Sequence, residues 1–221
     1  MNYIKINNIP VLIQKSLRAK RIALKQQTSG EILLVVPKYC PVWMATAFAK
    51  TQQAWITAHA KHPPQRTTFV PGMVIQLVGQ TLTLAQGKPT RVENGVLYLS
   101  GDIQFFHRRA CDYAKKILLS FMQQEVTTLT QNLSIHAKHI TLRNTSSRWG
   151  SCSSSHNLSF CWKIAFAPLP VIQYLAAHEV AHLVHMNHSQ NFWQLVDKLT
   201  PHRKEAEKWL KLNGQKLQGI I

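Results

Sequence analysis

The chain has 221 residues, of which 45% are hydrophobic and 16% are charged, and these values are ordinary for a globular core. It contains no uninterrupted apolar run of about 18 residues, which argues against a membrane-spanning segment. Lysine and arginine number 26 against nine aspartates and glutamates, a formal net charge of +17. Such a charge attracts polyanions.

The densest basic cluster comprises Lys15, Arg18, Lys20, Arg21 and Lys25. One interpretation is non-specific contact with the phosphates of DNA or RNA, and the alternative is a solvated basic surface. No zinc finger or aromatic RNA-binding consensus accompanies the charge. No basic stretch followed by an apolar segment opens the chain, so we expect a cytoplasmic location. No oligomeric state is predicted.

Four cysteines, Cys40, Cys111, Cys152 and Cys161, form no C-x-x-C pair. We therefore expect reduced thiols, and the alternative is a disulfide between Cys152 and Cys161 across a hairpin.

In the first part of the chain, short apolar-polar alternation from Tyr3 to Val36 predicts antiparallel strands with a turn at Thr28–Gly30. The segment Val42–Lys61 has a helical pattern that ends at His62–Pro64. Strands return between Phe69 and Leu99, where the Asn94–Gly95 pair predicts a hairpin.

A long helix is predicted from Ile103 to Asn132. We place a domain boundary near residue 101, so that residues 1–101 form a β-rich domain with one helix and residues 102–221 form a second domain. The fold class is therefore α+β.

Strands and helices alternate in the second domain. The sequence predicts a strand at His139–Asn144, a polar loop at Thr145–Ser155, a strand at Asn157–Ala165, a helix that starts near Pro170, a helix capped by Ser189, and a last helix that opens at Thr200–Pro201 and stops at Gly214 before a frayed basic tail.

The central motif is H-E-V-A-H at His178–His182. On a helix the two histidines lie about 6 Å apart along the axis and roughly 40° apart around it, so both imidazoles can reach one metal ion. Glu179 then lies beside the open position of that metal, where its carboxylate can take a proton from a water molecule. His188 is the predicted third ligand, and Asn187 is suited to the turn that brings it back. His185 points about 60° away from His182, so it is not expected to be a ligand.

Other predicted site residues are less specific. Leu158, Phe160 and Trp162 lie on the strand before the motif, where an extended substrate could add as a further strand. Core packing is the alternative for this alternation, and also for Trp149. Arg148 is also assigned to substrate binding, and Arg148, Tyr174, His156 and His202 are candidates for stabilising an oxyanion. Gly150 is assigned to a tight turn.

Several segments together resemble the YgjP-like metallopeptidase family of bacteria, which is related to the SprT-like and WLM-type zincin proteases. They are R-W-G-S-C-S at Arg148–Ser153, L-S-F-C-W-K-I at Leu158–Ile164, Ala167–Pro168, H-E-V-A-H, and N-H-S-Q-N-F-W at Asn187–Trp193. The resemblance implies a zincin-like catalytic domain with His178, His182 and His188 as zinc ligands and Glu179 as catalytic base. Metzincins share the histidine spacing, but they have glycine where this chain has His185.

The sequence thus predicts a metallopeptidase with one zinc ion per chain and a protein or peptide substrate, which meets DNA- or RNA-bound proteins through its charge. Two alternatives remain: a nucleic-acid-binding module with a structural zinc, and a zinc hydrolase of a non-peptide amide.

Overall fold

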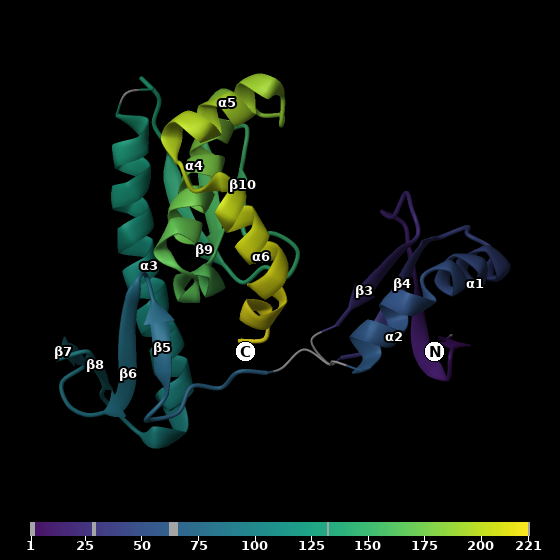
Figure 1. Cartoon of the computed structure of the whole chain (residues 1–221), viewed down its shortest axis with the longest axis horizontal. Helices are drawn as coiled ribbons and strands as arrows, with labels where there is room; N and C mark the ends of the chain where they lie inside the picture. Colours follow the sequence, from purple (N-terminus) through teal and green to yellow (C-terminus); the bar gives the residue numbers. More distant parts are fainter. Residues whose placement is uncertain (1–2, 28–29, 62–65, 132, 221) are drawn as a thin grey trace. The chain divides into compact units, whose positions relative to one another are not determined.

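A computed structural model describes residues 3–27, 30–61, 66–131 and 133–220 (Figure 1). The chain forms two compact units, Met1–Thr67 and Thr68–Ile220, each with its own hydrophobic core. Thr28 and Ser29 of the predicted turn, the predicted helix break at His62–Pro64, and Asn132 lie outside the described residues. No helix within the described ranges is long and apolar enough to cross a membrane.

The first unit contains a four-stranded sheet and two helices. Its strands, in the spatial order β1-β2-β4-β3, are β1 (Tyr3–Ile6), β2 (Ile9–Ser16), β4 (Ile32–Pro37) and β3 (Ala23–Gln26). The outer pairs are antiparallel, as predicted, but the central strands β2 and β4 are parallel. The expectation of a wholly antiparallel sheet is therefore wrong at its centre, because the chain forms the edge strand β3 before it returns as β4.

The helix predicted at Val42–Lys61 is two helices, α1 (Val42–Thr51) and α2 (Gln53–Lys61). Gln52 between them leaves the helical conformation, with φ −103° and ψ 18°. The Thr51 hydroxyl donates a hydrogen bond of 2.8 Å to the carbonyl of Phe48. Such local bonds from threonine can compete with the helical ladder, and the break follows Thr51 directly.

The second unit begins with a sheet of order β5-β6-β8-β7, formed by β5 (Val74–Leu77), β6 (Gln80–Gln86), β8 (Val96–Leu99) and β7 (Arg91–Glu93). Asn94 and Gly95 turn between β7 and β8 with positive φ values of 51° and 76°, which confirms the predicted hairpin.

These strands share one core with the rest of the second unit, including Leu84, Leu97 and the long helix α3 (Phe106–Thr130). Val78 also donates a backbone hydrogen bond of 2.8 Å to Ala165. The division of the chain thus falls at Thr67–Thr68 and not near residue 101 as the sequence suggested, because contacts distant in sequence tie residues 68–101 to the second unit.

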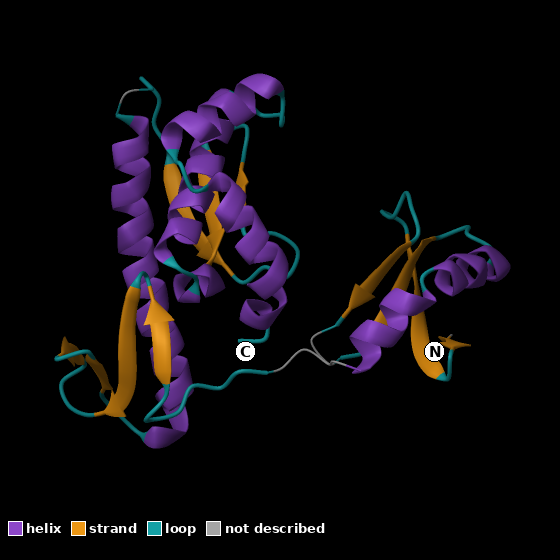
Figure 2. Ribbon diagram, in the orientation of Figure 1, coloured by secondary structure: helices purple, strands orange, loops and turns teal. Residues whose placement is uncertain are grey.

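A three-stranded sheet of order β10-β11-β9 lies beside α3 and the later helices (Figure 2). Its strands are β9 (His139–Arg143), β10 (Gly150–Cys152) and β11 (Asn157–Cys161). β11 is central, parallel to β9 and antiparallel to β10. The predicted polar loop Thr145–Ser155 therefore contains a short strand, β10, and the predicted strand Asn157–Ala165 ends at Cys161, where the 3-10 helix η2 (Trp162–Phe166) follows.

Three helices complete the unit: α4 (Leu169–Val184), α5 (Gln190–Leu199) and α6 (Arg203–Gln218). Ser189 caps α5 as predicted, because its side chain accepts a hydrogen bond from Phe192 N at 3.4 Å. The last helix does not stop at Gly214, and the basic tail after it is helical. Gly214 is buried, and a Cβ atom there would lie 3.2 Å from the ring of Trp149, so the glycine permits close packing inside the helix. All four cysteines are free, as expected.

Candidate metal centre and active site

The helix α4 carries the first two histidines of the candidate site. Its apolar residues, including Ala176, Ala177, Val180 and Ala181, are fully buried. The helix is thereby fixed against the core, with His178 and His182 partly exposed on another side. It ends at His185, whose backbone is extended and whose N–H still bonds to Ala181 O at 2.8 Å. The chain is then free to turn back toward the helix.

His188 returns to the same place. One ring nitrogen from each of His178, His182 and His188 lies within 4.8 Å of the other two, a spacing that suits three ligands of one metal ion. The Nε2 atoms of His178 and His188 are 3.3 Å apart. The structure thus brings together the three histidines that the sequence pattern singled out.

Phe192 and Trp193 hold this arrangement from α5. The buried ring of Phe192 lies 5.0, 4.4 and 4.8 Å from the rings of His178, His182 and His188. The Trp193 ring lies 5.5 Å from that of His188, and the Arg203 guanidinium lies over the Trp193 ring, 5.0 Å from its centre. These aromatic residues pack beside the histidine helix.

Hydrogen bonds at Nδ1 decide which nitrogen of two histidines is free. His182 Nδ1 lies 3.0 Å from the carbonyl of His185, which can only accept, so Nδ1 carries the proton. The hydroxyl of Tyr174 donates its proton to Glu207 Oε1 at 3.0 Å. The oxygen of that hydroxyl lies 3.5 Å from His178 Nδ1 and can accept a hydrogen bond from it. Both contacts leave Nε2 with its lone pair, and such partners orient metal-binding histidines in many proteins.

Burial keeps these imidazoles neutral. Desolvation, together with the neighbouring His182 and His188, lowers the pKa of His178 to about 4. Burial also lowers the pKa of His182. Neutral imidazole is the form that binds a metal, so the cluster is suited to that task.

Glu179 is buried, with 3% of its surface exposed. Burial raises the pKa of its carboxyl to about 8, and the positive charge of Arg148 opposes the rise. Its Oε2 atom has no hydrogen-bond partner among the described residues. A buried carboxylate oxygen without a partner is costly, which makes it a strong indication of a functional group.

Gly150 makes room for that carboxylate. A Cβ atom on residue 150 would collide with the Glu179 carboxylate. The glycine lies in β10, opposite Phe160 of β11, and not in a tight turn as the sequence suggested. The signal for this role is the position of the residue, since a glycine inside a strand often marks a close approach of another group.

Three of the residues that the sequence assigned to substrate binding lie in the core. Leu158, Phe160 and Trp162 are 0%, 1% and 6% exposed. Leu158 and Phe160 belong to the central strand of the sheet, and Trp162 to η2, so their side chains are unavailable to a substrate and the core-packing alternative describes them. Arg148 is exposed, and its charge acts on Glu179.

The other oxyanion candidates have different positions. Tyr174 is 5% exposed and bonded to Glu207. His156 lies in the turn between β10 and β11 with φ 59°, and His202 precedes α6. Neither joins the histidine cluster. Sequence reasoning did not predict the contact between the Tyr174 hydroxyl and His178 Nδ1. The signal for it is their four-residue spacing, which places both side chains on one face of a helix.

The three-stranded sheet has two edge strands, β10 and β9, since β11 is paired on both sides. Of these, β10 lies against Glu179 through Gly150. Cys161 N bonds to Trp149 O at 2.7 Å and Ser153 N to Asn157 O at 3.0 Å. Alternation along an antiparallel pair then makes Ser151 the residue bonded to β11. The same alternation directs the backbone N–H and C=O groups of Gly150 and Cys152 away from β11, toward the open edge of the sheet. Strand addition at β11, as the sequence suggested, is therefore ruled out by its two neighbours.

Comparisons with known proteins complete the description of the site. No curated protein matches the chain. Among solved structures, the crystal structure of the metallopeptidase zymogen of Pyrococcus abyssi abylysin is similar at 18% sequence identity and a TM-score of 0.38, over 45% of this chain and 99% of that one. The YgjP-like metallopeptidase domain matches residues 20–213, most of the chain. The resemblance predicted from the motifs is confirmed, and the chain belongs to the YgjP-like metallopeptidase family.

Proposed function

We propose that this protein is a zinc-dependent peptidase in which His178, His182 and His188 hold the metal and Glu179 is the general base. The observation that carries the proposal is the convergence of three histidines beside a buried carboxylate that has one oxygen without a partner. Structural zinc sites have four protein ligands, whereas catalytic sites have three and keep one position open. Within the described part of the chain the cluster has three.

The residues fit zinc in kind as well as in number. Imidazole nitrogen is a preferred zinc ligand, and the bonds of Nδ1 in His178 and His182 leave Nε2 for the metal. Zinc bound there would polarise the carbonyl of the scissile peptide and make a water molecule acidic enough to lose a proton near neutral pH.

Glu179 performs the proton transfers. Its carboxylate accepts a proton from the attacking water while the water oxygen bonds to the peptide carbon. The carbon–nitrogen bond then breaks, and Glu179 returns the proton to the leaving amine. Burial raises the pKa of the carboxyl, which strengthens it as an acceptor for the proton of the attacking water. Arg148, whose charge acts on Glu179, is our candidate for stabilising the negative charge that develops on the carbonyl oxygen.

The edge of β10 is the proposed place for the substrate. Gly150 and Cys152 present outward backbone groups, and Gly150 lies directly against Glu179. An extended peptide that pairs with this edge would carry its backbone past the carboxylate. The net charge of +17 supports a further proposal, that the substrates are proteins associated with nucleic acid.

The first test is the zinc content of purified protein. We expect about one zinc per chain in the wild type, since three neutral imidazoles form one site, and none in a His178→Ala, His182→Ala double variant. His185→Ala is the matched control, because it removes the adjacent histidine but leaves the backbone carbonyl that orients His182. A wild type that takes up no zinc even when zinc is added would refute the proposal, and so would a loss of zinc as large in the control as in the double variant.

The second test separates the proposed peptidase from its two alternatives. Glu179→Gln should keep the zinc and the fold but lower the cleavage of labelled denatured casein by about 10²–10⁴-fold. If zinc-loaded wild type cleaves no peptide bond but hydrolyses small amides, and Glu179→Gln abolishes that activity, the protein is a hydrolase of another amide. If the zinc-loaded wild type cleaves neither casein nor small amides, and Glu179→Gln keeps the same fold and zinc content, the zinc is structural.

A further inference from the structure

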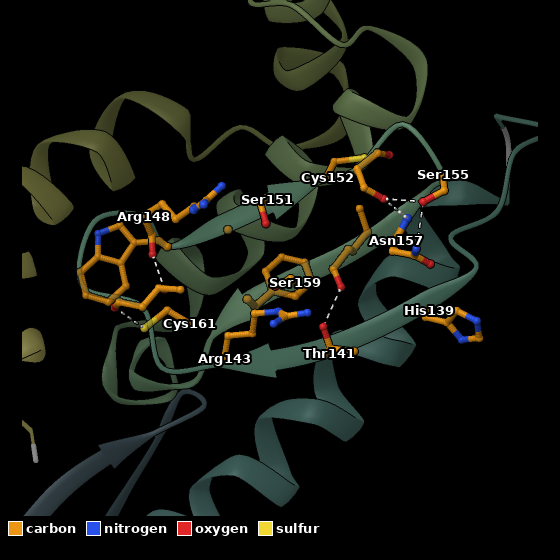
Figure 3. A pocket seen from close by; sticks show the side chains of 16 residues that line it. His139, Thr141, Arg143, Arg148, Ser151, Cys152, Ser155, Asn157, Ser159 and Cys161 are labelled. Carbon is orange, nitrogen blue, oxygen red and sulfur yellow. Dashed lines mark hydrogen bonds between the residues drawn. The ribbon is translucent and has the colours of Figure 1, made fainter. Parts of the chain in front are cut away.

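A second hollow lies on the other face of the three-stranded sheet. It has a volume of about 650 Å³ and is lined by all three strands and by the loop that precedes β10 (Figure 3). Its lining includes Thr141, Arg143, Arg148, Ser151 and Ser159. The proposed peptidase chemistry uses the inner face, the edge of β10 and Arg148, and it assigns no role to Thr141, Arg143, Ser151 or Ser159 on this outer face.

Strand register explains why this face is polar. Directly paired residues point to the same side of a sheet, and Ser159 is paired with Thr141 on one side and Ser151 on the other. These three hydroxyl residues therefore form one row across the sheet. The neighbouring residues Leu158 and Phe160 point to the opposite side and are buried. The hydroxyl groups of Ser151 and Ser159 can donate hydrogen bonds to a ligand laid across the strands, whereas that of Thr141 donates to the carbonyl of Leu158 at 3.4 Å.

The hollow is also basic. Arg143, paired with Cys161, and Arg148, in the loop before β10, are both exposed. Figure 3 shows both side chains beside the row of hydroxyls, with His139 at the other end. None of the described residues that line the hollow is acidic, and neither arginine makes an ion pair within 4.0 Å in the described part of the chain. Two arginines and a row of hydroxyls suit a ligand with phosphate groups.

The aromatic ring of Trp149 narrows the choice of ligand. Trp149 is half-buried, packs near Gly214 and also lines the hollow. Proteins that bind single-stranded nucleic acid combine a positive groove for the backbone with aromatic rings on which bases stack. An acidic peptide would leave the ring unused and carries its charges on flexible side chains. A duplex keeps its bases paired and out of reach of the ring.

We propose that the outer face of the β10-β11-β9 sheet binds single-stranded nucleic acid, with Arg143 and Arg148 on the phosphates. This site depends on the outer face alone and holds whether or not the histidine cluster binds metal. Because the same three strands separate it from Glu179, bound nucleic acid and the proposed catalytic edge are close neighbours. A protein carried on the strand would thus meet the edge of β10.

The test is fluorescence anisotropy with a labelled oligothymidylate, titrated at several salt concentrations. In the Arg143→Ala, Arg148→Ala variant we expect about tenfold weaker binding or more at low salt. The slope of log affinity against log salt should fall by about 1.4, since each phosphate contact on a single strand contributes about 0.7. The charge-preserving Arg143→Lys, Arg148→Lys variant should restore most of the slope. Melting temperatures equal to that of the wild type would show that both variants keep the fold.

The matched control is the Arg18→Ala, Arg21→Ala variant, which removes two exposed arginines from the densest basic cluster of the first unit. It should bind nearly as the wild type does. An equal loss of oligothymidylate affinity in the Arg143/Arg148 and Arg18/Arg21 variants would overturn the proposal, because binding would then depend on the overall positive charge of the protein. Competition by polyglutamate as strong as that by unlabelled oligothymidylate would overturn it as well. All titrations are repeated with Glu179→Gln protein stripped of metal by EDTA, where binding should persist. Failure of nucleic-acid binding and failure of peptidase chemistry are therefore observed separately.

Discussion

The two faces of the β10-β11-β9 sheet differ in almost every property although they are built from the same three strands. The inner face buries Leu158 and Phe160 and admits one carboxylate, that of Glu179, at the position where Gly150 lacks a side chain. The outer face carries hydroxyls and arginines around an open hollow. Because successive residues of a strand point to opposite sides, a stretch of alternating sequence encodes both surfaces at once. Substitutions at neighbouring positions can therefore test one face while the other serves as control.

The largest expected difference between the faces is in stability. Phe160→Ala should lower the free energy of unfolding by about 3–5 kcal/mol, since it removes a fully buried ring and leaves a cavity. Ser159→Ala, one residue earlier and on the outer face, should change it by less than about 0.5 kcal/mol. Urea denaturation measures both. Similar losses for the two variants would mean that the faces are not divided as described.

Gly150→Ala tests the one place where the inner face admits a polar group. The new methyl group should displace the Glu179 carboxylate, with a loss of about 1–3 kcal/mol in stability and of about 100-fold in peptidase activity. Unfolding and cleavage are measured in the same preparation. The destabilisation should shrink in a Glu179→Ala background, because the colliding atoms are then absent. An undiminished effect in that background would place the clash elsewhere. Ser151→Ala, on the outer face, is the control for stability.

A smaller effect is expected from Tyr174, which packs on the same side of the sheet through α4. Tyr174→Phe removes the hydroxyl that lies between His178 Nδ1 and Glu207. Zinc affinity should fall by about 10- to 100-fold, because partners of metal-binding histidines contribute about that much. Competition with a zinc-binding dye measures it. Glu207→Gln keeps an oxygen acceptor and should have less effect. An unchanged zinc affinity in Tyr174→Phe would show that the tyrosine does not orient the histidine.

The histidine cluster could be predicted from sequence because it depends on local spacing. His178 and His182 are one helical turn apart, and the chain between His182 and His188 is too short to carry the third ring far away. The alternation of Leu158 to Cys161 likewise gave the strand β11 correctly. In these places a few adjacent residues determine the geometry, so no knowledge of distant contacts was needed.

The features that sequence reasoning missed depend on contacts distant along the chain. The strand β10 consists of glycine, serine and cysteine, which have little preference for strands, and it forms because β11 pairs with it. The helix α6 continues through Gly214, whose lack of a side chain leaves room for Trp149. The boundary near residue 101 was misplaced because Leu84 and Leu97 pack into the core of the second unit. Each of these depends on a partner at least six residues away along the chain.

The shortness of β10 limits how long any bound chain can remain there. Three residues offer outward backbone groups at only two positions, Gly150 and Cys152. A long exposed edge would invite copies of the protein to join sheet to sheet, whereas so short a one resists such self-association. The small number of backbone groups at this edge also favours rapid dissociation of cleaved fragments, because few hydrogen bonds must break. In such an enzyme, turnover would be limited less by product release than by how often a substrate segment is delivered to the edge.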